Sequence, residues 1–377
     1  MIDSSVTSRR WGLDLLRAIA ILSVVEGHGR SISAKIAENL KFIGLTDGVD
    51  LFFVLSGFLI GNILIKDHIE NKRINIYSFW IRRWLRTLPI YFIALIANFI
   101  FMLFVFHYAF DKKDMLLHFG FLQNMIPPYT DHRFFSEAWS LSIEEYFYLC
   151  LPLALISISI ITKIKNTKTL FILGLLSLIS FSFACRMYLF HRMPIENLTL
   201  TEWNTRFRII IPLRLDSLAV GVFAALVRTF FKELWRNKKF IVVCFLIGIT
   251  GVFLLDRTWI FNGTIPLNFF SCVPYFLLYS IGVSLTLPLL DNWQPRPNLF
   301  TRIISWISKL SYSMYLFHNS LIVVPFRNYA HSIPEHPRVQ MGLYGLYWIL
   351  VFTIAYAGYT FIEKPILQYR DRKYPNH

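Results

Sequence analysis

The first apolar segment of the chain, residues 11–29, carries four side chains that could do chemistry inside a bilayer: Asp14, Arg17, Glu26 and His28. A charge near the bilayer centre is costly, so such a residue usually has a partner or a functional role. Ten residues separate Arg17 from His28, which is about 16 Å, or half a bilayer, along a helix. We therefore expect one helix to carry a cation toward one membrane face and an imidazole, a suitable general base, toward the other.

Two arginines farther along have the spacing of an anion site. Arg83 and Arg86 are three residues apart, so they share a face if the segment is helical. Guanidinium groups suit bidentate phosphate binding. The alternative is a plain membrane anchor, because these residues lie in the most basic segment between spans, just before Pro89 is expected to open the third span.

Two adjacent carboxylates, Glu144 and Glu145, fall at the expected outer mouth of the fourth span. Ser140, Glu144 and Tyr148 recur every four residues and would form a polar stripe on one helix face. Glu145 has the spacing of a capping box with the serine three residues before it, which would give it a structural role. Glu144 is therefore the better functional candidate, and we expect it to orient His28 or to hold a substrate.

The second span contains small residues at four-residue spacing. Ser56, Gly57 and Phe58 are followed by Gly61. In a membrane helix this pattern is typical of close helix packing. A flat surface for a ligand is the functional alternative, and the two roles are compatible.

A second imidazole, His318, lies well inside the ninth predicted span. Ser311, Tyr315 and His318 are spaced along one helical face. A lone histidine in a membrane helix can simply hydrogen-bond a neighbouring helix. Because the first span already carries His28, a cavity shared by the two imidazoles becomes the stronger hypothesis.

Arg214 and Asp216 lie at the membrane edge of the sixth predicted span. Two residues apart on one helix, they do not face each other. Structural pairing across helices is the default expectation for both. Asp14 and Asp216 are the expected partners of Arg17 if it is paired.

The composition indicates a membrane protein rather than a soluble one. Of the 377 residues, 55% are hydrophobic and only 16% are charged, against about 25% charged in soluble domains. The net charge of +15 arises largely between apolar segments, the pattern of cytoplasmic loops, so we expect no nucleic-acid partner. The four cysteines stand in apolar stretches without a CxxC motif, and we expect no metal site.

The apolar runs predict an all-α, polytopic bundle of about ten transmembrane helices. The chain is expected to form one domain, residues 1–377, with a core at 11–365, short cytoplasmic termini and no appended domain. The excess of Lys and Arg on alternate connections favours an orientation with both termini in the cytoplasm. The predicted spans are residues 12–30, 48–66, 88–107, 138–161, 169–190, 210–228, 240–256, 266–289, 305–325 and 341–362.

Together these stretches resemble the acyltransferase-3 family of integral membrane acyltransferases. Seven motifs occur in the family's order between about residues 11 and 365. They are LDLLRAIAILSVVEGH, GVDLFFVLSGFLIG, RRWLRTLP, WSLSIEEYFY, RLDSLAVG, SYSMYLFH and FIEKP. Glu26 is one position where a more apolar residue is expected, although the Arg-x10-His spacing is intact.

The resemblance implies that an acyl group, most often acetyl, passes from cytoplasmic acyl-CoA to a hydroxyl outside the cytoplasm. Acceptors in the family are mostly sugars of surface polysaccharides, lipopolysaccharide or peptidoglycan. Some relatives carry an additional SGNH-type domain, which this chain is expected to lack. The implied location is the inner (cytoplasmic) membrane, with acetyl-CoA, a carbohydrate and the bilayer as partners.

The motifs and the residue patterns together define the candidate site. The expected catalytic residues are His28, Glu144, Arg17 and His318, with His28 as general base or as carrier of the acyl group. The expected donor-binding residues are Arg83, Arg86, Ser56, Gly57 and Phe58. The expected acceptor-binding residues are Trp139, Glu145, Tyr148 and Asp216. The alternative function is a proton-coupled transporter of a small anion, which ten spans with buried charges would also fit.

Overall fold

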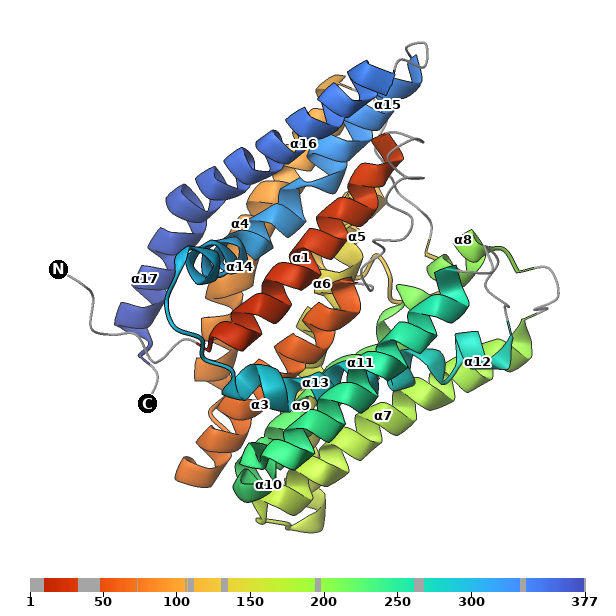
Figure 1. Cartoon of the computed structure of the whole chain (residues 1–377). Coiled ribbons are helices and arrows are strands. Elements are labelled where there is room, and N and C mark those ends of the chain that lie inside the picture. The colour runs from red at the N-terminus through yellow and green to blue at the C-terminus, as the bar shows by residue number, and fades with distance from the viewer. Residues whose placement is uncertain are drawn as a thin grey trace.

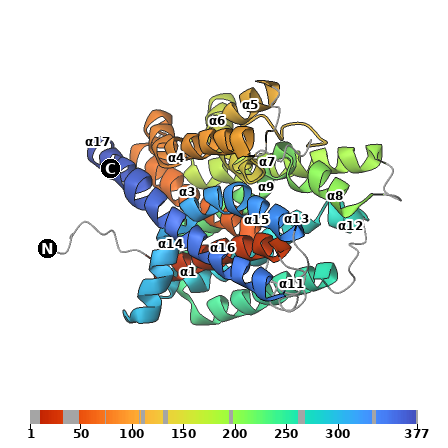
Figure 2. The same cartoon turned by 90° about the horizontal axis from the view of Figure 1, so that it is seen from above.

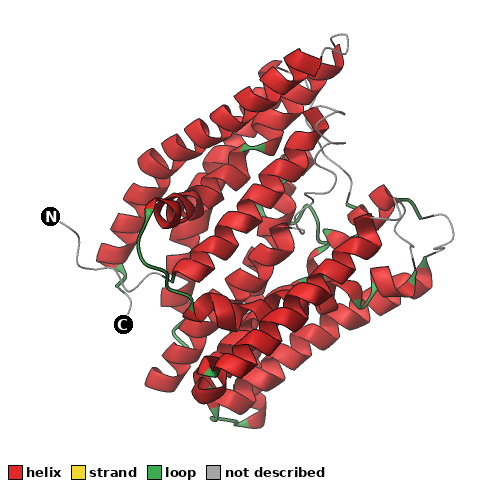
Figure 3. Ribbon diagram, viewed as in Figure 1, coloured by secondary structure: helices red, strands yellow, loops and turns green. Residues whose placement is uncertain are grey.

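Helices make up all the regular structure in the described part of the chain. The computed structural model describes residues 10–32, 48–72, 74–105, 107, 112–129, 135–193, 198–260, 268–332 and 337–375. Within these residues there is no strand, which confirms the all-α class (Figure 3). Residues 1–9 and 376–377, which belong to the termini predicted to be short and cytoplasmic, lie outside the described residues.

Long helices form the body of the molecule, and each of the ten predicted spans overlaps one of them. They are α1 (Trp11–Gly29), α3 (Gly48–Asn71), α4 (Ile76–Val105), α6 (Ala138–Thr162), α7 (Thr167–Arg192), α9 (Leu215–Phe230), α11 (Lys238–Ile260), α13 (Tyr275–Asn292), α14 (Leu299–Phe317) and α16 (Pro337–Gly358). The short helices and turns are η1 (Arg30–Ile32), α5 (Lys112–Phe119), α8 (Leu200–Trp203), η2 (Asn204–Arg208), η3 (Ile211–Leu213), α10 (Lys232–Arg236), α12 (Phe269–Cys272), η4 (Asn319–Val323), α15 (Val324–Ser332), η5 (Tyr359–Glu363) and α17 (Lys364–Lys373).

Six helical stretches in the described chain are long and apolar enough to cross a membrane. They are Gly48–Asn71, Ile76–Val105, Ala138–Thr162, Thr167–Arg192, Lys238–Asp256 and Arg338–Lys373. Their outward faces expose large apolar side chains such as Ile96, Leu176, Leu246 and Ile349, as expected for contact with lipid. The protein is therefore a multi-pass membrane protein, while the count of ten crossings and the orientation stay predictions.

Helix α1 occupies the middle of the bundle. It packs against α14 on one side and against α3 and α13 on the other, with α16 beyond α14 (Figure 1). Seen from above, α5 and α6 lie at the edge of the molecule opposite α11 (Figure 2). The helix that carries Arg17 and His28 is thus in contact with several of the helices that hold the other candidate residues.

The start of α4 differs from the prediction. The helix begins at Ile76 and runs through Pro89, whereas the span was expected to open at Pro89. The side chain of Asn75 accepts a hydrogen bond from the backbone N–H of Ser78 (3.1 Å) and so marks the true start. Proline is tolerated within membrane helices because neighbouring groups satisfy the freed backbone. In consequence, Arg83 lies inside the helix rather than in a connecting loop.

Close packing of α3 on α9 depends on glycine. A Cβ atom at Gly57 would overlap the backbone carbonyl of Leu218, and one at Gly221 would overlap that of Val54. The two backbones therefore approach each other as small residues allow in membrane helices. The packing role that the spacing of Ser56, Gly57 and Gly61 favoured is confirmed for Gly57.

Replacing Gly57 with alanine should lower the stability of the bundle. The new methyl group has to push α9 away from α3, and overpacking of this kind costs about 1–3 kcal/mol. We expect a lower Tm for the detergent-solubilised protein. Gly251→Ala in α11 is the matched control, since a Cβ there meets nothing within 4 Å; an equal Tm for both variants would contradict the packing role.

The two ends of the bundle are named here from α1. At the Arg10 end lie the starts of α1 and α4, the ends of α3, α9 and α13, and α17. Ion pairs of Arg10 with Asp291 and of Arg82 with Asp371 (3.2 Å) join several of these helices. At the opposite end, the His28 end, lie the end of α1 and the starts of α3, α6 and α9.

Candidate active site

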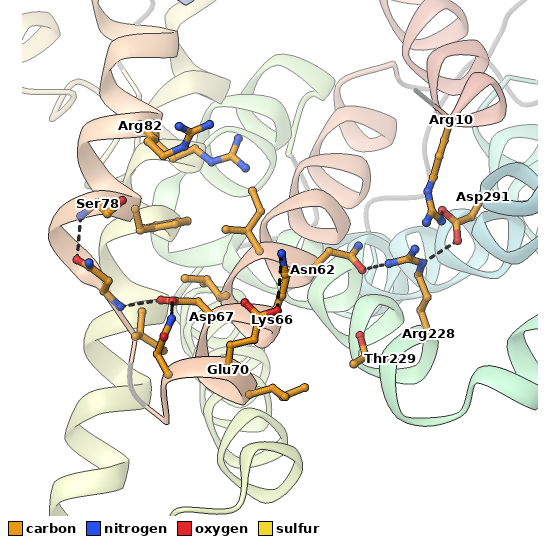
Figure 4. A pocket seen from close by; sticks show the side chains of 18 of the residues that line it. Arg10, Asn62, Lys66, Asp67, Glu70, Ser78, Arg82, Arg228, Thr229 and Asp291 are labelled. Atoms are coloured by element: carbon orange, nitrogen blue, oxygen red, sulfur yellow. Dashed lines mark hydrogen bonds and ion pairs between the residues drawn. The ribbon is translucent and has the colours of Figure 1, made fainter. Parts of the chain in front are cut away.

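A large cavity lies at the Arg10 end, with a volume of about 1580 Å³ (Figure 4). We call it the basic vestibule. Its cationic lining residues are Arg10, Lys66, Arg82, Arg83, Arg86, Arg228, Lys232, Arg236 and Arg370. Its carboxylates are Asp67, Glu70 and Asp291. Because cations far outnumber carboxylates, the vestibule suits a large anionic ligand.

Part of this positive charge is neutralised by fixed ion pairs. Asp291 accepts hydrogen bonds from Arg10 and from Arg228 Nε (2.8 Å), and Arg228 also donates to Asn62, as Figure 4 shows. In contrast, Arg83 and Arg86 have no carboxylate ion-pair partner within the part of the chain that the structure describes. Lys232 and Arg236 likewise form no ion pair among the described residues, so these four lining cations can meet an incoming anion.

A second, smaller cavity of about 90 Å³ lies deeper in the bundle, and Arg83 and Arg86 line both cavities. We call it the inner chamber. Five helices supply its polar lining residues: Arg17, Ser56, Arg83, Arg86, Thr87, Ser140, Glu144, Tyr148, Ser311, Tyr312 and Tyr315. The sequence motifs on α1, α3, α4, α6 and α14 thus meet around one space.

Glu144 lies on the arginine side of this chamber rather than at the outer mouth of its span. Its carboxylate accepts hydrogen bonds from Ser56 Oγ (3.1 Å) and from Tyr148 Oη (2.8 Å). The guanidinium of Arg83 lies 5.7 Å from the centre of the Tyr148 ring. His28 does not line the inner chamber. The expectation that Glu144 orients His28 is therefore corrected: Glu144 faces the arginine that was expected to bind the donor.

The capping role expected for Glu145 is also wrong. Helix α6 begins at Ala138, so Ser142 is already inside the helix, where its hydroxyl donates to the Ala138 carbonyl (3.2 Å). Glu145 instead accepts a hydrogen bond from Thr87 Oγ1 on α4 (2.7 Å). Glu145 therefore joins α6 to α4 directly behind the arginine pair.

His28 and His318 form a direct pair, as the hypothesis of a shared site required. Nδ1 of His28 lies 2.7 Å from Nε2 of His318, and the two rings are nearly parallel, with 7° between their planes. His318 is fully buried, whereas the side chain of His28 is exposed. The imidazole of His28 is therefore accessible from the surface, and the buried imidazole of His318 holds it in place.

The hydrogen bonds of His318 determine the tautomers of the neutral pair. His318 Nδ1 lies 2.8 Å from the carbonyl of Tyr315 and 3.1 Å from that of Met314. Carbonyls only accept, so Nδ1 carries the proton and Nε2 carries a lone pair. His28 must then donate from its Nδ1 to His318. This assignment leaves a lone pair on Nε2 of His28, as a general base or nucleophile requires.

A buried carboxylate that the sequence did not single out supports this histidine pair. Glu137 accepts hydrogen bonds from the backbone N–H (3.1 Å) and hydroxyl (2.5 Å) of Ser320, at the wide helical turn η4 that follows His318. Tyr315 donates to the Glu137 carbonyl (3.0 Å). Burial raises the pKa of the Glu137 carboxyl above its usual range. Its sequence signal was its position two residues before the Trp-Ser-Leu-Ser motif.

Tyr315 connects the inner chamber with the histidine pair. Its hydroxyl lies 2.6 Å from Ser140 Oγ, and its ring centre is 5.9 Å from that of His318. Tyr315 also lines the inner chamber. The sequence indicated Tyr315 only as a residue on the same helical face as His318. In the structure it lies between the inner chamber and the histidine pair.

Arg17 lines the inner chamber from α1. Its guanidinium contacts Asp14 Oδ1 at 3.4 Å and the hydroxyl of Ser308 at 3.3 Å. Ser308 in turn donates to Asp14 (2.9 Å). Of the two partners expected for Arg17, Asp14 is therefore the one in contact, and this cluster joins α1 to α14.

Five predicted contact residues line neither cavity: Glu145, described above, and Asp216, Trp139, Gly57 and Phe58. Asp216 forms a fully buried ion pair with Arg186 (2.5 Å), so it has the structural pairing across helices that was the default expectation. Trp139 lies beneath the guanidinium of Arg208 (5.0 Å to the ring centre). The other two, Gly57 and Phe58, face α9 and α10: Gly57 packs on Leu218 and Phe58 stacks on Trp235.

Arg214, the neighbour of Asp216 at the sixth span, is paired in the same way. It forms a buried ion pair with Asp50 at the start of α3, and its guanidinium also lies over the ring of Phe276 (4.2 Å). Both charges of the Arg-x-Asp segment thus have partners on other helices.

Known proteins resemble this chain over most of its length. Residues 10–362 match the family described as "Acyltransferase domain". The chain is 28% identical over 384 residues to O-acetyltransferase OatA of Staphylococcus aureus strain NCTC 8325, and equally to that of strain MW2. Each alignment covers 94% of this chain and 57% of the relative, so the chain spans little more than half the length of these relatives. No solved structure matches the chain. The chain therefore belongs to the acyltransferase-3 family.

Proposed function

We propose that the protein transfers an acetyl group from acetyl-CoA, bound in the basic vestibule, to a carbohydrate hydroxyl at the His28 end. The observation that carries this proposal is that Arg83 and Arg86 line both cavities and form no direct ion pair among the described residues. A donor with anionic groups at one end and a thioester at the end of a long arm fits two cavities joined in this way.

The donor is proposed to bind through its phosphates first. Arg83 and Arg86 share a helix face and can each form bidentate contacts with a diphosphate. The nucleotide then occupies the basic vestibule, and the pantetheine arm enters the inner chamber beside Ser56, Glu144 and Tyr148. In this position the thioester approaches Tyr315, whose ring adjoins His318.

The histidine pair is proposed to activate the acceptor. Nε2 of His28 takes the proton of a carbohydrate hydroxyl, and the resulting oxygen attacks the thioester carbonyl. The carbon–sulfur bond breaks, the CoA thiolate leaves and takes the proton back from His28, and the products are an O-acetyl sugar and CoA. Before each transfer, His318 holds neutral His28 in the tautomer with a lone pair on Nε2.

Label transfer tests the proposed reaction. Membranes containing the protein are incubated with acetyl-CoA labelled in the acetyl group and with a panel of methyl glycosides. We expect label in at least one glycoside and release of CoA in equal amount. Uptake of a solute without consumption of acetyl-CoA would instead support the transporter, which the family membership does not favour.

Loss of Arg83 should weaken donor binding. Arg83→Ala is expected to raise the KM for acetyl-CoA about tenfold to a hundredfold, because a hydrogen bond to a charged group contributes about 1.5–3 kcal/mol. The KM for acetyl-3′-dephospho-CoA should rise by the same factor, since both donors carry the diphosphate. Lys165→Ala is the control, because Lys165 is exposed and lines neither cavity. An unchanged KM for acetyl-CoA in Arg83→Ala would contradict binding of the diphosphate at Arg83.

A further inference from the structure

The cations that line the basic vestibule divide into two kinds, those with a carboxylate partner and those without one. Among the described residues the partnered cations are Arg10 and Arg228 (with Asp291), Lys66 (with Glu70), and Arg82 and Arg370 (with Asp371). The other lining cations form no ion pair there, and they come from two helices: Arg83 and Arg86 from α4, Lys232 and Arg236 from α10. The vestibule therefore has two separate groups of cations that an anion can reach.

Helix α10 turns its two cations toward the vestibule. Lys232, Trp235 and Arg236 line this cavity, whereas Glu233 and Leu234 of the same helix do not. Residues three and four apart share one face of a helix, so the lining residues are those of a single face. The face of α10 that borders the vestibule is therefore cationic and carries no carboxylate.

Trp235 fixes this face in place. Its side chain is buried, its Nε1–H donates to Asp291 (3.0 Å), and its ring stacks on Phe58 with the ring centres 5.8 Å apart. Its carbonyl accepts a hydrogen bond from the side-chain amide of Asn292 (3.1 Å). Because α10 is attached in this way to α3 and α13, less conformational entropy is lost when its cations bind a ligand.

The two groups of cations lie on different sides of the vestibule. Figure 4 shows Arg82 of α4 on one side and Thr229 of α9 on the other, with Asn62 of α3 between them. Arg83 directly follows Arg82, and Lys232 follows Thr229 by three residues. A ligand that contacts both groups must therefore carry negative charge at two separate places.

Coenzyme A carries its negative charge at two such places. One is the diphosphate, which the proposed function assigns to Arg83 and Arg86. The other is the phosphate on the 3′ carbon of the ribose, a monoester with a charge of about −1.5 to −2 at pH 7. The two phosphate groups leave the ribose from different carbons, so they can reach different walls of one cavity.

We propose that Lys232 and Arg236 bind the 3′-phosphate of the donor, so that the protein distinguishes acetyl-CoA from nucleotides that lack this phosphate. This inference rests on the proposed function, since it takes acetyl-CoA as the donor. The alternative is that the two cations only attract anionic lipid headgroups, as basic residues near a membrane surface do. Such a role would not distinguish one soluble nucleotide from another.

Binding of CoA and of 3′-dephospho-CoA to the detergent-solubilised protein tests the proposal without an acceptor. Calorimetric titration gives the Kd of each nucleotide. The wild-type protein should bind CoA about tenfold more tightly, as expected for at least one charge-assisted hydrogen bond to the 3′-phosphate. In Lys232→Ala/Arg236→Ala the Kd for CoA should rise about tenfold, while the Kd for 3′-dephospho-CoA should stay within about twofold.

Lys238→Ala/Lys239→Ala is the matched control, because it removes two exposed cations from the neighbouring start of α11 that line neither cavity. The preference for CoA should persist in this control. It should also persist in Arg83→Ala, which is expected to weaken the binding of both nucleotides by the same factor.

The outcomes separate the subsite from the proposed function. A wild-type protein that binds both nucleotides equally would overturn the subsite and leave the proposed transfer intact. A Lys232→Ala/Arg236→Ala protein that keeps the preference, or that loses affinity for both nucleotides equally, would have the same consequence. A wild-type protein that binds neither nucleotide would overturn acetyl-CoA as the donor and the subsite with it.

Discussion

Replacing His28 with alanine is expected to reduce acetyl transfer by about two to four orders of magnitude, the usual contribution of a positioned general base. His28 is the exposed member of the histidine pair, and its Nε2 is the nitrogen left without a proton. Among the described residues, no imidazole other than His28 contacts His318, so none there can take over the proton of the acceptor hydroxyl. The measurement is label transfer from acetyl-CoA to a methyl glycoside at saturating donor.

The effect of His28→Ala should be confined to the chemical step. Binding of acetyl-CoA, measured by protection of the protein against thermal unfolding, should persist because the donor is proposed to bind at Arg83 and Arg86. His191→Ala, at an exposed histidine at the end of α7, is the control and should behave like the wild type. Full transfer activity in His28→Ala would contradict the proposed mechanism, even if acetyl-CoA binds in the basic vestibule.

The imidazoles and the arginine pair could be recognised from the sequence because the membrane makes them conspicuous. A charged or titratable side chain in an apolar span is costly, so Arg17, His28 and His318 stood out at once. Their spacing also carried real geometry, since Arg83 and Arg86 share a face on any helix. In the structure, Arg17, Arg83 and Arg86 line the cavities, and His28 and His318 form the histidine pair.

The surroundings of Glu144 could not be predicted, although the start of its helix was. The predicted span begins at residue 138, and α6 begins at Ala138. Spacing within α6 also placed Tyr148 on the face of Glu144, where it donates a hydrogen bond to the carboxylate. Spacing could not show that Ser56 of α3 and Arg83 of α4 lie against the same face.

The partners of the buried charges could not be predicted either. They depend on how helices that are far apart in the sequence are rotated against each other. Asp216 pairs with Arg186, 30 residues away, and Glu137 with Ser320, 183 residues away. Spacing rules describe one helix at a time. They therefore excluded a pair between Arg214 and Asp216 but could not say which helix would supply either partner.

Replacing His318 should show that the second imidazole acts through the first. In His318→Leu the apolar side chain fills a similar space but cannot accept the hydrogen bond from the Nδ1–H of His28, so the tautomer with a lone pair on Nε2 loses its support. We expect kcat to fall by about a hundredfold or more, as when the orienting group of a catalytic histidine is lost. The KM for acetyl-CoA should stay unchanged, since His318 lines neither cavity.

His318→Gln provides the matched comparison, because glutamine has nearly the same volume as leucine and its amide oxygen can accept the hydrogen bond of His28. If His318 sets the tautomer, glutamine should recover at least about tenfold of the kcat that leucine loses, the free energy of roughly one hydrogen bond. A residue that merely fills space would give equal rates for both variants, or favour leucine, since a buried amide left unsatisfied is destabilising. The order of the two rates therefore separates a positioning role for His318 from a packing role, and it does so without knowledge of the natural acceptor.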